Sequence, residues 1–354
     1  MHDVSQSRRK TALPREGRDR RAARRRSDAE GSDRTFAIRL PAPPSSRHGH
    51  ARSGTAEGSV STGGGRKPGC DVPSIAILSS GLWRIRRQVE SATGHEAVRW
   101  SFWSRPAFDA VGGWGLKPTA ATARALARDT ATPYVSLEDG FIRSVHPGPA
   151  EAPLSIVVDH TGTHYDSRLP SDLESLVAAR ATDPGSEARA RRAMDRLAGQ
   201  AISKYNSAPL RSLKCLGFTA RPSGGRVLVV DQTVGDASIA GAGASAETFD
   251  TMLAAARREN PGAEIVVKTH PEVSNGRKRG YLSAAAGPGI SIQSDLVNPW
   301  PLFASVDRVY TVSSQLGFEA LIAGLPVTCF GAGFYAGWGL TDDRLPVPRR
   351  TARP

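Results

Sequence analysis

Acidic residues and one histidine stand at the ends of apolar runs, and together they could carry out a group-transfer reaction. Each of Glu138, Asp139, Asp159, Asp231 and His270 ends or closely follows such a run. In a set of this kind one acid can attack or stabilise carbon, another can move a proton, and the imidazole can meet a departing phosphate. For any single acid, an N-cap of the next helix is the plainer interpretation. The prediction therefore depends on the residues as a group.

The stretch 309–341 predicts a strand that delivers polar residues to the start of a helix. Val309–Val312 is a β-branched and aromatic run, and Ser313, Ser314 and Gln315 follow it. Ser314 is a good N-cap. Backbone N–H groups and hydroxyls at such a turn can bind an anion such as phosphate. An ordinary capped helix is the alternative, and this stretch alone does not decide between the two.

Charge divides the chain at about residue 70. Residues 1–70 hold 16 Lys and Arg against 7 Asp and Glu, which is +9 of the chain's formal +13. They show almost no apolar periodicity, so a disordered basic extension is predicted. Its arginine runs could touch nucleic acid or anionic lipid, although a solvated tail is the plainer interpretation. The remaining 284 residues are enough for two modest α/β domains.

Hydropathy and cysteine spacing limit the class of protein further. No apolar stretch is long enough to span a membrane, and no apolar segment of the secretory type follows the N-terminal charges. Cys70, Cys215 and Cys329 lie far apart and lack the spacing of metal ligands. Cys215 and Cys329 have apolar neighbours and are expected to be reduced core residues of a cytosolic protein.

Short apolar runs alternate with longer amphipathic stretches from Ser74 onward, which predicts strands alternating with helices. The first half is expected to contain strands 74–78, 110–113, 133–137 and 154–159, and helices 83–90, 119–128, 171–181 and 186–204. This alternation favours a parallel sheet covered by helices.

The alternation starts again behind RPSGGR at 221–226, which has the composition of a linker. The second half is expected to contain strands 227–230, 264–268, 290–292 and 309–312 and a helix at 246–259. Two Rossmann-like halves, 71–220 and 221–354, imply a cleft between them. Ligands of open α/β sheets bind beyond the carboxyl ends of the strands, where the acids and the histidine stand.

Several strings along the chain resemble one family, the capsule polysaccharide β-Kdo transferases of the KpsC type. The resemblance runs in order from about Gly81 to Arg344. It is carried by GLWRI (81–85), WGLKPTA (114–120), LEDGFIRS (137–144), LSIVVDHTGTHYDSRLPSDLE (154–174), ISKYN (202–206), VLVVDQTVGDASI (227–239), KTHP (268–271), VYTVSSQLGFEAL (309–321) and FYAGWGLTDDR (334–344).

The resemblance implies a glycosyltransferase with two Rossmann-like domains, of the GT-B type. It implies transfer of 3-deoxy-manno-octulosonic acid (Kdo) from CMP-Kdo to a Kdo-bearing (lyso)phosphatidylglycerol lipid, with retention of configuration and without metal or other cofactor. The first half is expected to recognise the acceptor and the second the cytidine nucleotide. The expected place is the cytoplasmic face of the inner membrane, with other capsule assembly proteins as partners.

The resemblance also gives roles to catalytic residues. Asp231, the acid of the VVDQT string, is expected to be the nucleophile that forms a covalent Kdo intermediate, with a turn or N-cap role as its alternative. Glu138 is expected to be the general acid/base on the acceptor side. Asp139 could shape the same loop through turn hydrogen bonds. Asp159, which also ends a strand, is the main rival for the nucleophile.

The remaining candidates are binding residues. The expected donor-binding residues are His270, Lys268, Gln232, Ser313, Ser314, Gln315 and Glu319. The expected acceptor-binding residues are Arg143, Asp159, Tyr165, Asp166, Lys204 and Asn206. Several have plainer alternatives: a strand-edge charge for Lys268, a helix-surface charge for Glu319, a surface ion pair for Arg143, and a hinge role for Lys204 and Asn206.

The chain departs from the family in two ways. Family members commonly carry two transferase modules in tandem, whereas this chain has room for one, and its GLWRI and WGLKPTA strings resemble the N-terminal module, which favours a β-2,4 linkage. Only LPVPRRTARP follows Arg344, where closing helices usually stand. The expectation is a truncated donor domain, with a less stable fold and a cleft that closes less well.

Two other functions stay open on the sequence. One is a non-catalytic or degenerate component of capsule assembly or export that binds the glycolipid. The other, ranked last, is nucleic-acid binding through the basic segment 1–70.

Overall fold

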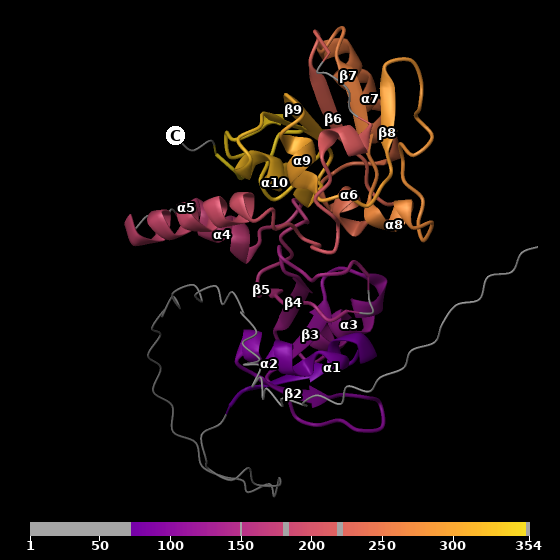
Figure 1. Ribbon diagram of the computed structural model, residues 1–354. Helices are drawn as coiled ribbons and strands as arrows, with labels where there is room; N and C mark the ends of the chain where they lie inside the picture. The colour runs from indigo at the N-terminus through magenta and orange to yellow at the C-terminus, as the bar shows by residue number, and fades with distance from the viewer. Residues whose placement is uncertain (1–71, 149–150, 180–183, 218–221, 352–354) are drawn as a thin grey trace, which may run out of the picture. The chain divides into compact units, whose positions relative to one another are not determined.

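The computed structural model describes residues 72–148, 151–179, 184–217 and 222–351, and the disordered extension predicted at 1–70 lies outside these ranges. The described residues form a mixed α/β fold with two largely parallel sheets (Figure 1). One sheet takes its strands from residues 74–159 and the other from residues 226–343. The domain boundaries given above stay a prediction.

The first sheet has five strands in the order β2-β1-β3-β4-β5. They are β1 (Ser74–Ile77), β2 (Glu96–Arg99), β3 (Ala110–Trp114), β4 (Tyr134–Asp139) and β5 (Ile156–Asp159). The first four are parallel, whereas β5 pairs antiparallel with β4. The carboxyl ends of β1 to β4 therefore lie along one edge, and β4 brings Glu138 and Asp139 there.

Helices cover both faces of this sheet. α1 (Ser80–Arg84) and α2 (Arg86–Thr93) bury Leu82 and Val89 against Ile75, Ile77 and Leu137. On the opposite face, α3 (Ala121–Asp129) buries Ala123 and Ala127 against Ala76 and Val111, behind the short 3₁₀ helix η1 (Pro118–Ala120). The central strands β1 and β3 are covered on both faces and are therefore almost wholly apolar, which makes them predictable from the sequence.

The second sheet has six parallel strands in the order β11-β10-β9-β6-β7-β8. They are β6 (Arg226–Val230), β7 (Glu264–Lys268), β8 (Ile290–Gln293), β9 (Arg308–Thr311), β10 (Val327–Cys329) and β11 (Asp342–Asp343). Alternate residues of β6 point to opposite faces. Val227 and Val229 pack with Phe249 and Met252, whereas Leu228 and Val230 pack with Leu302, Phe303 and Ala320.

The helices of the second half pack against the two faces of this sheet. They are α6 (Ala237–Gly241), α7 (Ala246–Glu259), α8 (Pro271–Ser274), α9 (Pro299–Phe303) and α10 (Gln315–Ile322). α7 contributes to the cluster on one face, and α9 and α10 contribute to the other. Ser314 accepts a hydrogen bond from the Leu316 N–H, so the predicted N-cap of α10 is confirmed.

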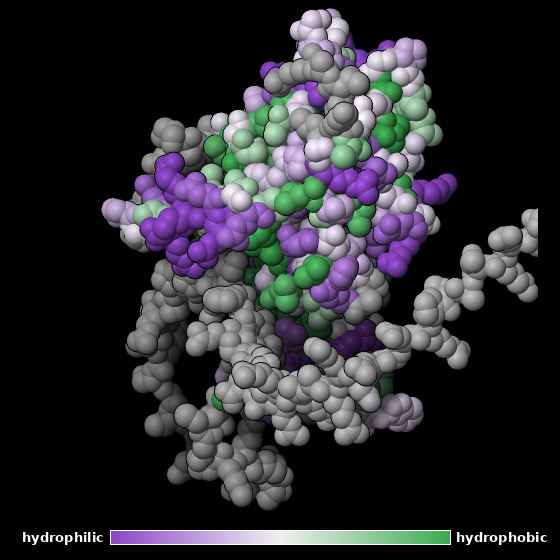
Figure 2. Space-filling model, in the orientation of Figure 1, coloured by the Kyte–Doolittle hydropathy of each residue, from purple (hydrophilic) through white to green (hydrophobic). Residues whose placement is uncertain are grey.

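Two further helices lie between the strands of the two sheets in sequence. α4 (Asp172–Ala179) and α5 (Pro184–Gly199) bury no residue completely, and the 3₁₀ helix η2 (Leu213–Leu216) follows them. Arg189, Arg192 and Arg196 of α5 are all exposed, and Figure 2 shows hydrophilic residues gathered over this helix.

The structure corrects several expectations. β2, β10 and β11 were not predicted, because all three are short and two of them contain charged residues. Glu138 and Asp139 lie within β4 rather than behind it, and the predicted strand 154–159 begins at Ile156 and is antiparallel. Cys329 is buried as expected, but Cys215 is exposed in η2, so its assignment to the core was wrong. Apolar neighbours in sequence do not ensure burial in so short a helix.

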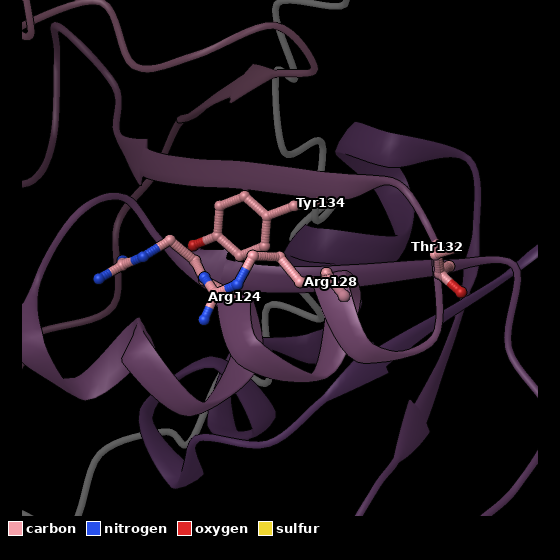
Figure 3. A pocket seen from close by; sticks show the side chains of 6 residues that line it. Arg124, Arg128, Thr132 and Tyr134 are labelled. Atoms are coloured by element: carbon pink, nitrogen blue, oxygen red, sulfur yellow. The ribbon is translucent and has the colours of Figure 1, made fainter.

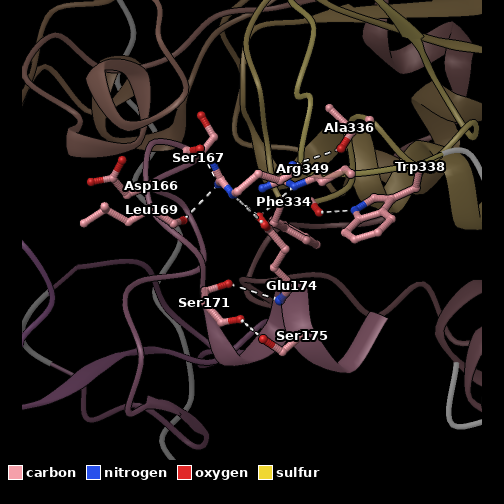
Figure 4. Close-up of polar contacts among 12 residues, drawn as sticks. Asp166, Ser167, Leu169, Ser171, Glu174, Ser175, Phe334, Ala336, Trp338 and Arg349 are labelled. Carbon is pink, nitrogen blue, oxygen red and sulfur yellow. Dashed lines mark hydrogen bonds and ion pairs between the residues drawn. The ribbon is translucent and has the colours of Figure 1, made fainter. Parts of the chain in front are cut away.

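The last described residues contact α4 through two adjacent arginines that share one carboxylate. The Nε atoms of Arg349 and Arg350 lie 3.0 Å from the two oxygens of Glu174 (Figure 4). Arg349 also donates to the carbonyls of Ser167 and Leu169, and Arg350 donates to those of Gly333 and Ala336 at 2.6 and 2.9 Å. The segment that follows β11 in the sequence thereby joins the Phe334–Trp338 loop to α4.

The two arginines are expected to differ in their contribution to stability. The Arg350 side chain is 2 % exposed, whereas that of Arg349 is 39 % exposed. Replacing Arg350 with Met leaves two carbonyls and part of the Glu174 charge without a donor, so the free energy of unfolding should fall by about 3–5 kcal/mol. Arg349→Met should cost about 0–1 kcal/mol. Urea unfolding followed by circular dichroism measures both, and equal losses in the two variants would contradict this difference.

Candidate active site

Polar residues from two neighbouring strands meet where the strand order of the second sheet changes direction. β6 and β9 are adjacent, although β7 and β8 intervene in sequence. Behind them, the Gln232 amide oxygen accepts from the Ser313 N–H at 3.0 Å, and its Nε2 donates to the hydroxyls of Ser313 and Ser238. The carboxyl edge of an open parallel sheet binds ligands at such a point. The structure therefore brings together two of the predicted donor-binding residues.

Asp231 directly follows β6 and is 1 % exposed. Its Oδ1 accepts from the N–H groups of Gln232 and Tyr281, at 2.8 and 3.0 Å, while its Oδ2 has no hydrogen-bond partner among the described residues. A Cβ on Gly280 would stand 2.1 Å from Oδ2, so glycine is needed there. Burial raises the pKa of Asp231 despite these hydrogen bonds. The carboxylate holds the 280–282 loop, and a substrate could reach it only if that loop moved.

Glu138 is a buried carboxyl group at the carboxyl edge of the first sheet. Its Oε1 accepts from the Tyr165 hydroxyl at 3.0 Å, and that hydroxyl accepts from the Leu116 N–H at 3.1 Å. Gly115 has a φ of +50° and passes so close that a Cβ would meet Oε1 at 1.9 Å. Burial raises the pKa of Glu138, although Lys117 and the Tyr165 hydrogen bond act against it. A fixed carboxyl group with a raised pKa is suited to proton transfer.

Asp139 and Arg143 form an ion pair beside Glu138. Arg143 Nε lies 2.9 Å from Asp139 Oδ2, and the same guanidinium donates to the Ser144 hydroxyl at 2.8 Å. Arg143 is buried, so the pair is not the surface ion pair considered above. Asp139 Oδ1 has no hydrogen-bond partner among the described residues. The pair leaves one carboxylate oxygen available in the site.

Lys204 is the cation around which the acids of both halves gather. Burial lowers the pKa of Lys204, but interactions with Tyr205, Asp139, Asp236 and Glu138 outweigh it and the pKa is raised. The lysine therefore stays charged at neutral pH. Both halves hold its backbone: the Lys204 N–H donates to Glu319 of the second half, and the Lys204 carbonyl accepts from the N–H groups of Arg143 and Ser144 in the first half. Of the predicted residues, Glu138, Asp139 and Lys204 are thus brought together.

His270 belongs to the same group and is held as a neutral imidazole. It is the N-cap of α8, and its Nδ1 accepts from the Glu272 N–H at 3.1 Å. Burial lowers the pKa of His270 to about 4, with Lys204 acting in the same direction. Because Nδ1 is an acceptor, we assign the proton to Nε2. The histidine can donate a hydrogen bond to an anion but does not carry a charge at neutral pH.

Lys268 is bonded to backbone carbonyls, and its contact with a phosphate stays a prediction. Its Nζ donates to the carbonyls of Thr269 and Asp295, at 2.9 and 3.2 Å, and the side chain is buried. Burial lowers the pKa of Lys268 to about 8, although Asp295 acts against it. The lysine is neither a strand-edge charge nor aimed at an open site, and it holds two loops together.

Glu319 joins α10 to the segment that carries Lys204. Its Oε2 accepts from the Ser203 hydroxyl at 2.7 Å, and its Oε1 accepts from the Lys204 N–H at 3.2 Å. Gln315 Nε2 donates to Glu319 Oε1 at 3.2 Å and to the Phe141 carbonyl at 2.6 Å. Glu319 is 6 % exposed, so it is not a helix-surface charge. Nucleotide contact by Gln315 and Glu319 stays a prediction, because both carry contacts between the two halves.

The donors at the start of α10 are also used within the protein. Ser313 N–H donates to Gln232, Ser314 N–H donates to the Thr311 hydroxyl, and Leu316 N–H donates to Ser314. This is the geometry of the capped helix that stood as the alternative above. Phosphate binding at Ser313 and Ser314 stays a prediction that requires some of these bonds to exchange.

Three of the predicted acceptor-binding residues shape loops. Asp159 Oδ1 accepts from the N–H groups of Thr161, Gly162 and Asp172, which places it as a turn and helix cap. Asp166 pairs with Arg168 at 2.7 Å. Asn206 accepts from the Ser203 N–H and donates to the Ser144 and Ser203 carbonyls, so it fixes the turn that presents Lys204.

The structure adds two residues to the candidates listed above. Asp236 is the N-cap of α6 and interacts electrostatically with Lys204, His270 and Tyr165. His164 is half-buried, with its ring against those of Phe141, Tyr165 and Phe334, and desolvation lowers its pKa to about 4. Both lie in strings that carry the family resemblance, which is the signal that could have found them.

The described residues contain neither a cluster of metal ligands nor a membrane-spanning helix. No group of three or more His, Cys, Asp or Glu side chains in them could hold a metal ion. No helix in the described ranges is long and apolar enough to cross a bilayer.

A shallow pocket of about 290 Å³ lies away from this group of residues. It is lined by Arg124, Ala127, Arg128, Ala131, Thr132 and Tyr134 at the end of α3 (Figure 3). Arg124 Nη1 and the Tyr134 hydroxyl both donate to the Gly115 carbonyl, at 3.0 and 2.8 Å. Two residues that line the pocket thus hold Gly115, which packs against Glu138 on its other side.

Comparison with known proteins assigns the chain to a family. Residues 109–354 match the family described as capsule polysaccharide biosynthesis protein. The match covers more than half of the chain, and the chain belongs to this family.

Two solved structures share the fold. One is Thermosulfurimonas dismutans KpsC, beta Kdo 2,4 transferase, with 40 % identity and a TM-score of 0.75, covering 80 % of this chain and 88 % of that one. The other is the beta Kdo 2,7 transferase of the same KpsC, with 28 % identity and a TM-score of 0.57, covering 79 % and 86 %. The mixed α/β fold is therefore similar to that of KpsC.

Curated relatives are longer than this chain. The capsule polysaccharide modification protein LipA of Neisseria meningitidis serogroup B is 47 % identical over 246 residues, which is 68 % of this chain and 35 % of LipA. The lipopolysaccharide-processing protein LpsZ of Rhizobium meliloti is 41 % identical over 245 residues, or 68 % of this chain and 55 % of LpsZ. The match thus spans about a third of LipA and about half of LpsZ.

The raised pKa of Glu138 predicts how its replacement changes stability with pH. Folded Glu138 retains its proton at pH values where the unfolded carboxyl, with a pKa of 4.5, has lost it. The wild-type protein therefore loses stability as pH rises from that value through the folded pKa. Glu138→Gln lacks this loss, so its stability relative to wild type should increase over that window. Urea unfolding of both proteins at several pH values from 4 to 8 measures the difference, and a difference that falls with pH would contradict the raised pKa.

Proposed function

We propose that this chain is a retaining glycosyltransferase of capsule polysaccharide biosynthesis, which moves Kdo from CMP-Kdo to a Kdo-bearing phospholipid. The support is its family and its similarity to the two Kdo transferase structures, at 40 % and 28 % identity. The higher identity and TM-score with the 2,4 transferase favour a 2,4 linkage.

The topology supports a GT-B-type arrangement of two Rossmann-like domains. Numbered within its own sheet, the second half has the strand order 6-5-4-1-2-3, which is the doubly wound dinucleotide-binding order read from the other edge. The first half has the order 2-1-3-4-5, which is the flavodoxin-like order with its last strand reversed. The nucleotide would then bind at the β6/β9 edge, where Gln232 and Ser313 meet.

One observation carries the proposed chemistry: a buried carboxyl group and a neutral imidazole both interact with the charged side chain of Lys204. Glu138 comes from the first half, and Asp236 and His270 come from the second. A transfer between a nucleotide sugar and a hydroxyl needs a proton acceptor on one side and stabilisation of a leaving phosphate on the other. This group offers both.

The leaving phosphate would be stabilised by Lys204 and His270. The lysine supplies charge, and the Nε2–H of the neutral imidazole supplies a hydrogen bond. Both act where burial weakens competition from water. We accordingly propose that transfer uses no metal or other cofactor and is retained in the presence of EDTA.

Retention follows from two displacements at the anomeric carbon. In the first, an Asp231 oxygen forms a bond to this carbon as the bond to the phosphate oxygen breaks, and CMP leaves with the electron pair. In the second, the acceptor hydroxyl oxygen attacks the same carbon, Asp231 departs, and ionised Glu138 takes the hydroxyl proton. A raised pKa makes the ionised form of Glu138 the stronger base.

Asp236 is a second candidate for the nucleophile. It is more exposed than Asp231, and it interacts with Lys204 and His270, whereas Asp231 is 1 % exposed and packs against Gly280. Asp231 needs the 280–282 loop to move, and Asp236 does not.

The acceptor would approach from the first half. A Kdo carboxylate could displace Asp139 from Arg143, because a guanidinium binds either carboxylate equally well. Asp159, Tyr165, Asp166 and Asn206 would support this side through the loops that they hold. The proposed partners are the lipid-linked acceptor, the inner-membrane surface at its cytoplasmic face, and other capsule assembly proteins.

A non-catalytic capsule assembly component is the competing function. The burial of Asp231 and the occupied donors at Ser313 and Ser314 favour it. Such a protein would bind the glycolipid without releasing CMP.

Intact-protein mass measurement after incubation with CMP-Kdo tests the mechanism. We expect an adduct of one Kdo residue on Glu138→Gln, because that variant forms the intermediate but lacks the base for the second step. Transfer to a synthetic Kdo-lipid should fall by about 10²–10⁴-fold in the same variant. Peptide mapping of the adduct distinguishes Asp231 from Asp236, and Asp159→Asn serves as the control for a buried carboxylate with a structural role.

Each outcome has a defined meaning. An adduct on Asp236 removes the role assigned to Asp231 and leaves the double displacement intact. Full transfer by both Asp231→Ala and Asp236→Ala would exclude a covalent intermediate on either acid. Tight acceptor binding without CMP release from the wild-type protein would establish the non-catalytic alternative.

A further inference from the structure

The turn that follows β2 in the sequence, at residues 101–104, exposes two adjacent aromatic side chains. Trp103 is 98 % exposed and Phe102 is 70 % exposed. The turn itself is ordered by hydrogen bonds from the Ser101 N–H to the Ser104 carbonyl at 2.9 Å and from the Ser104 N–H to the Ser101 hydroxyl at 3.1 Å. Large aromatic side chains normally bury most of their surface. A structured turn that holds two of them in water indicates a surface that is covered in use.

One arginine contacts this pair, and others lie on neighbouring elements. Arg105 lies 5.6 Å from the Phe102 ring centroid and donates to the Phe102 carbonyl. Arg99, the last residue of β2, is exposed and stacks on Trp83, as does Arg86. Further exposed arginines stand nearby in sequence on α1 and α2, at Arg84 and Arg87. Residues 84–109 carry five arginines against three acidic residues, Glu90, Glu96 and Asp109, and this net charge of +2 complements an anionic surface.

The turn lies on the same edge of the sheet as Glu138. β1 to β4 are parallel, and the turn begins directly beyond the carboxyl end of β2, as Glu138 stands at the carboxyl end of β4. Two strands, β1 and β3, separate β2 from β4. At about 4.8 Å between neighbouring strands, the sideways distance is about 15 Å. A surface seated on the turn would therefore lie near the entrance for an acceptor.

We propose that Phe102, Trp103 and Arg105 form a membrane anchor that seats this edge of the first half on an anionic phospholipid surface. The aromatic rings enter the headgroup region, where Trp and Phe partition favourably, and Arg99 and Arg105 bind lipid phosphates. The anchor does not depend on the transfer reaction, so its test is separate from that of the proposed function.

Exposed arginines alone do not make such an anchor, and α5 provides the comparison. It carries Arg189, Arg192 and Arg196 without an exposed aromatic side chain in its range. Surface charge attracts the protein to an anionic bilayer, but insertion of apolar side chains is needed to hold it there. Charge reversal at Arg192 is therefore a matched control for charge reversal at Arg105.

Co-sedimentation with lipid vesicles tests the anchor. The full chain should bind vesicles of equal parts phosphatidylglycerol and phosphatidylcholine, and should bind pure phosphatidylcholine at least about tenfold more weakly. The double variant Phe102→Ser/Trp103→Ser should lose at least about tenfold in affinity for the mixed vesicles. Arg105→Glu should also lose about tenfold there, whereas Arg192→Glu should stay within about twofold. Because these side chains are exposed, thermal unfolding of all variants should match that of the wild type.

Three results would overturn the proposal. The first is a wild-type protein that does not bind the mixed vesicles. The second is a double variant that binds them as tightly as wild type. The third is an equal loss in Arg105→Glu and Arg192→Glu, which would show attraction by net charge only. Loss of binding to a soluble Kdo oligosaccharide in the double variant, with vesicle binding unchanged, would assign the aromatic pair to sugar stacking instead.

Discussion

The contact between Glu319 and the Ser203–Lys204 segment is the interaction on which the candidate site depends. Glu319 belongs to α10 in the second half, and it accepts from the Ser203 hydroxyl and the Lys204 N–H. These bonds help to position Lys204, a cation that interacts with Glu138, Asp139 and Asp236. Arg143 and Lys117 also act on these acids, but loss of Lys204 from its place would remove one opposing charge and make burial of Glu138 beside Asp139 more unfavourable.

Burial and charge together set the protonation of the site. Desolvation raises the pKa of Glu138 and lowers that of His270, so both groups favour their neutral forms. Lys204 resists the same effect because several acidic groups surround it. A neutral imidazole donor, a fixed ammonium and a carboxyl group with a raised pKa are the components that the proposed transfer requires. Their arrangement is a property of the contact between the halves.

Much of the fold could be predicted because it follows from local patterns. The strands around Val227–Val230 and Glu264–Lys268 are apolar on both faces, and Ser314 caps α10 as its position suggested. The short strands β2 and β11 could not be predicted, since pairing with a neighbour and not composition makes them strands. The reversed direction of β5 is likewise a tertiary property, because nothing in the string LSIVVD encodes which way it runs.

The candidate site likewise has features that the local sequence predicts and features that only tertiary contacts determine. The sequence by itself determined the family strings, the alternation of strands and helices, and which reactive residue types end the strands, because these depend only on neighbours along the chain. Only the tertiary structure decided that Asp159 and Asp166 hold loops, that Lys268 faces backbone carbonyls, and that Asp236 and Lys204 join Glu138 and His270. The contacts of Asp159 and Asp166 are local, but the group around Lys204 depends on segments far apart in the chain, because desolvation and charge act through space, as in the bond between Ser203 and Glu319 at a separation of 116.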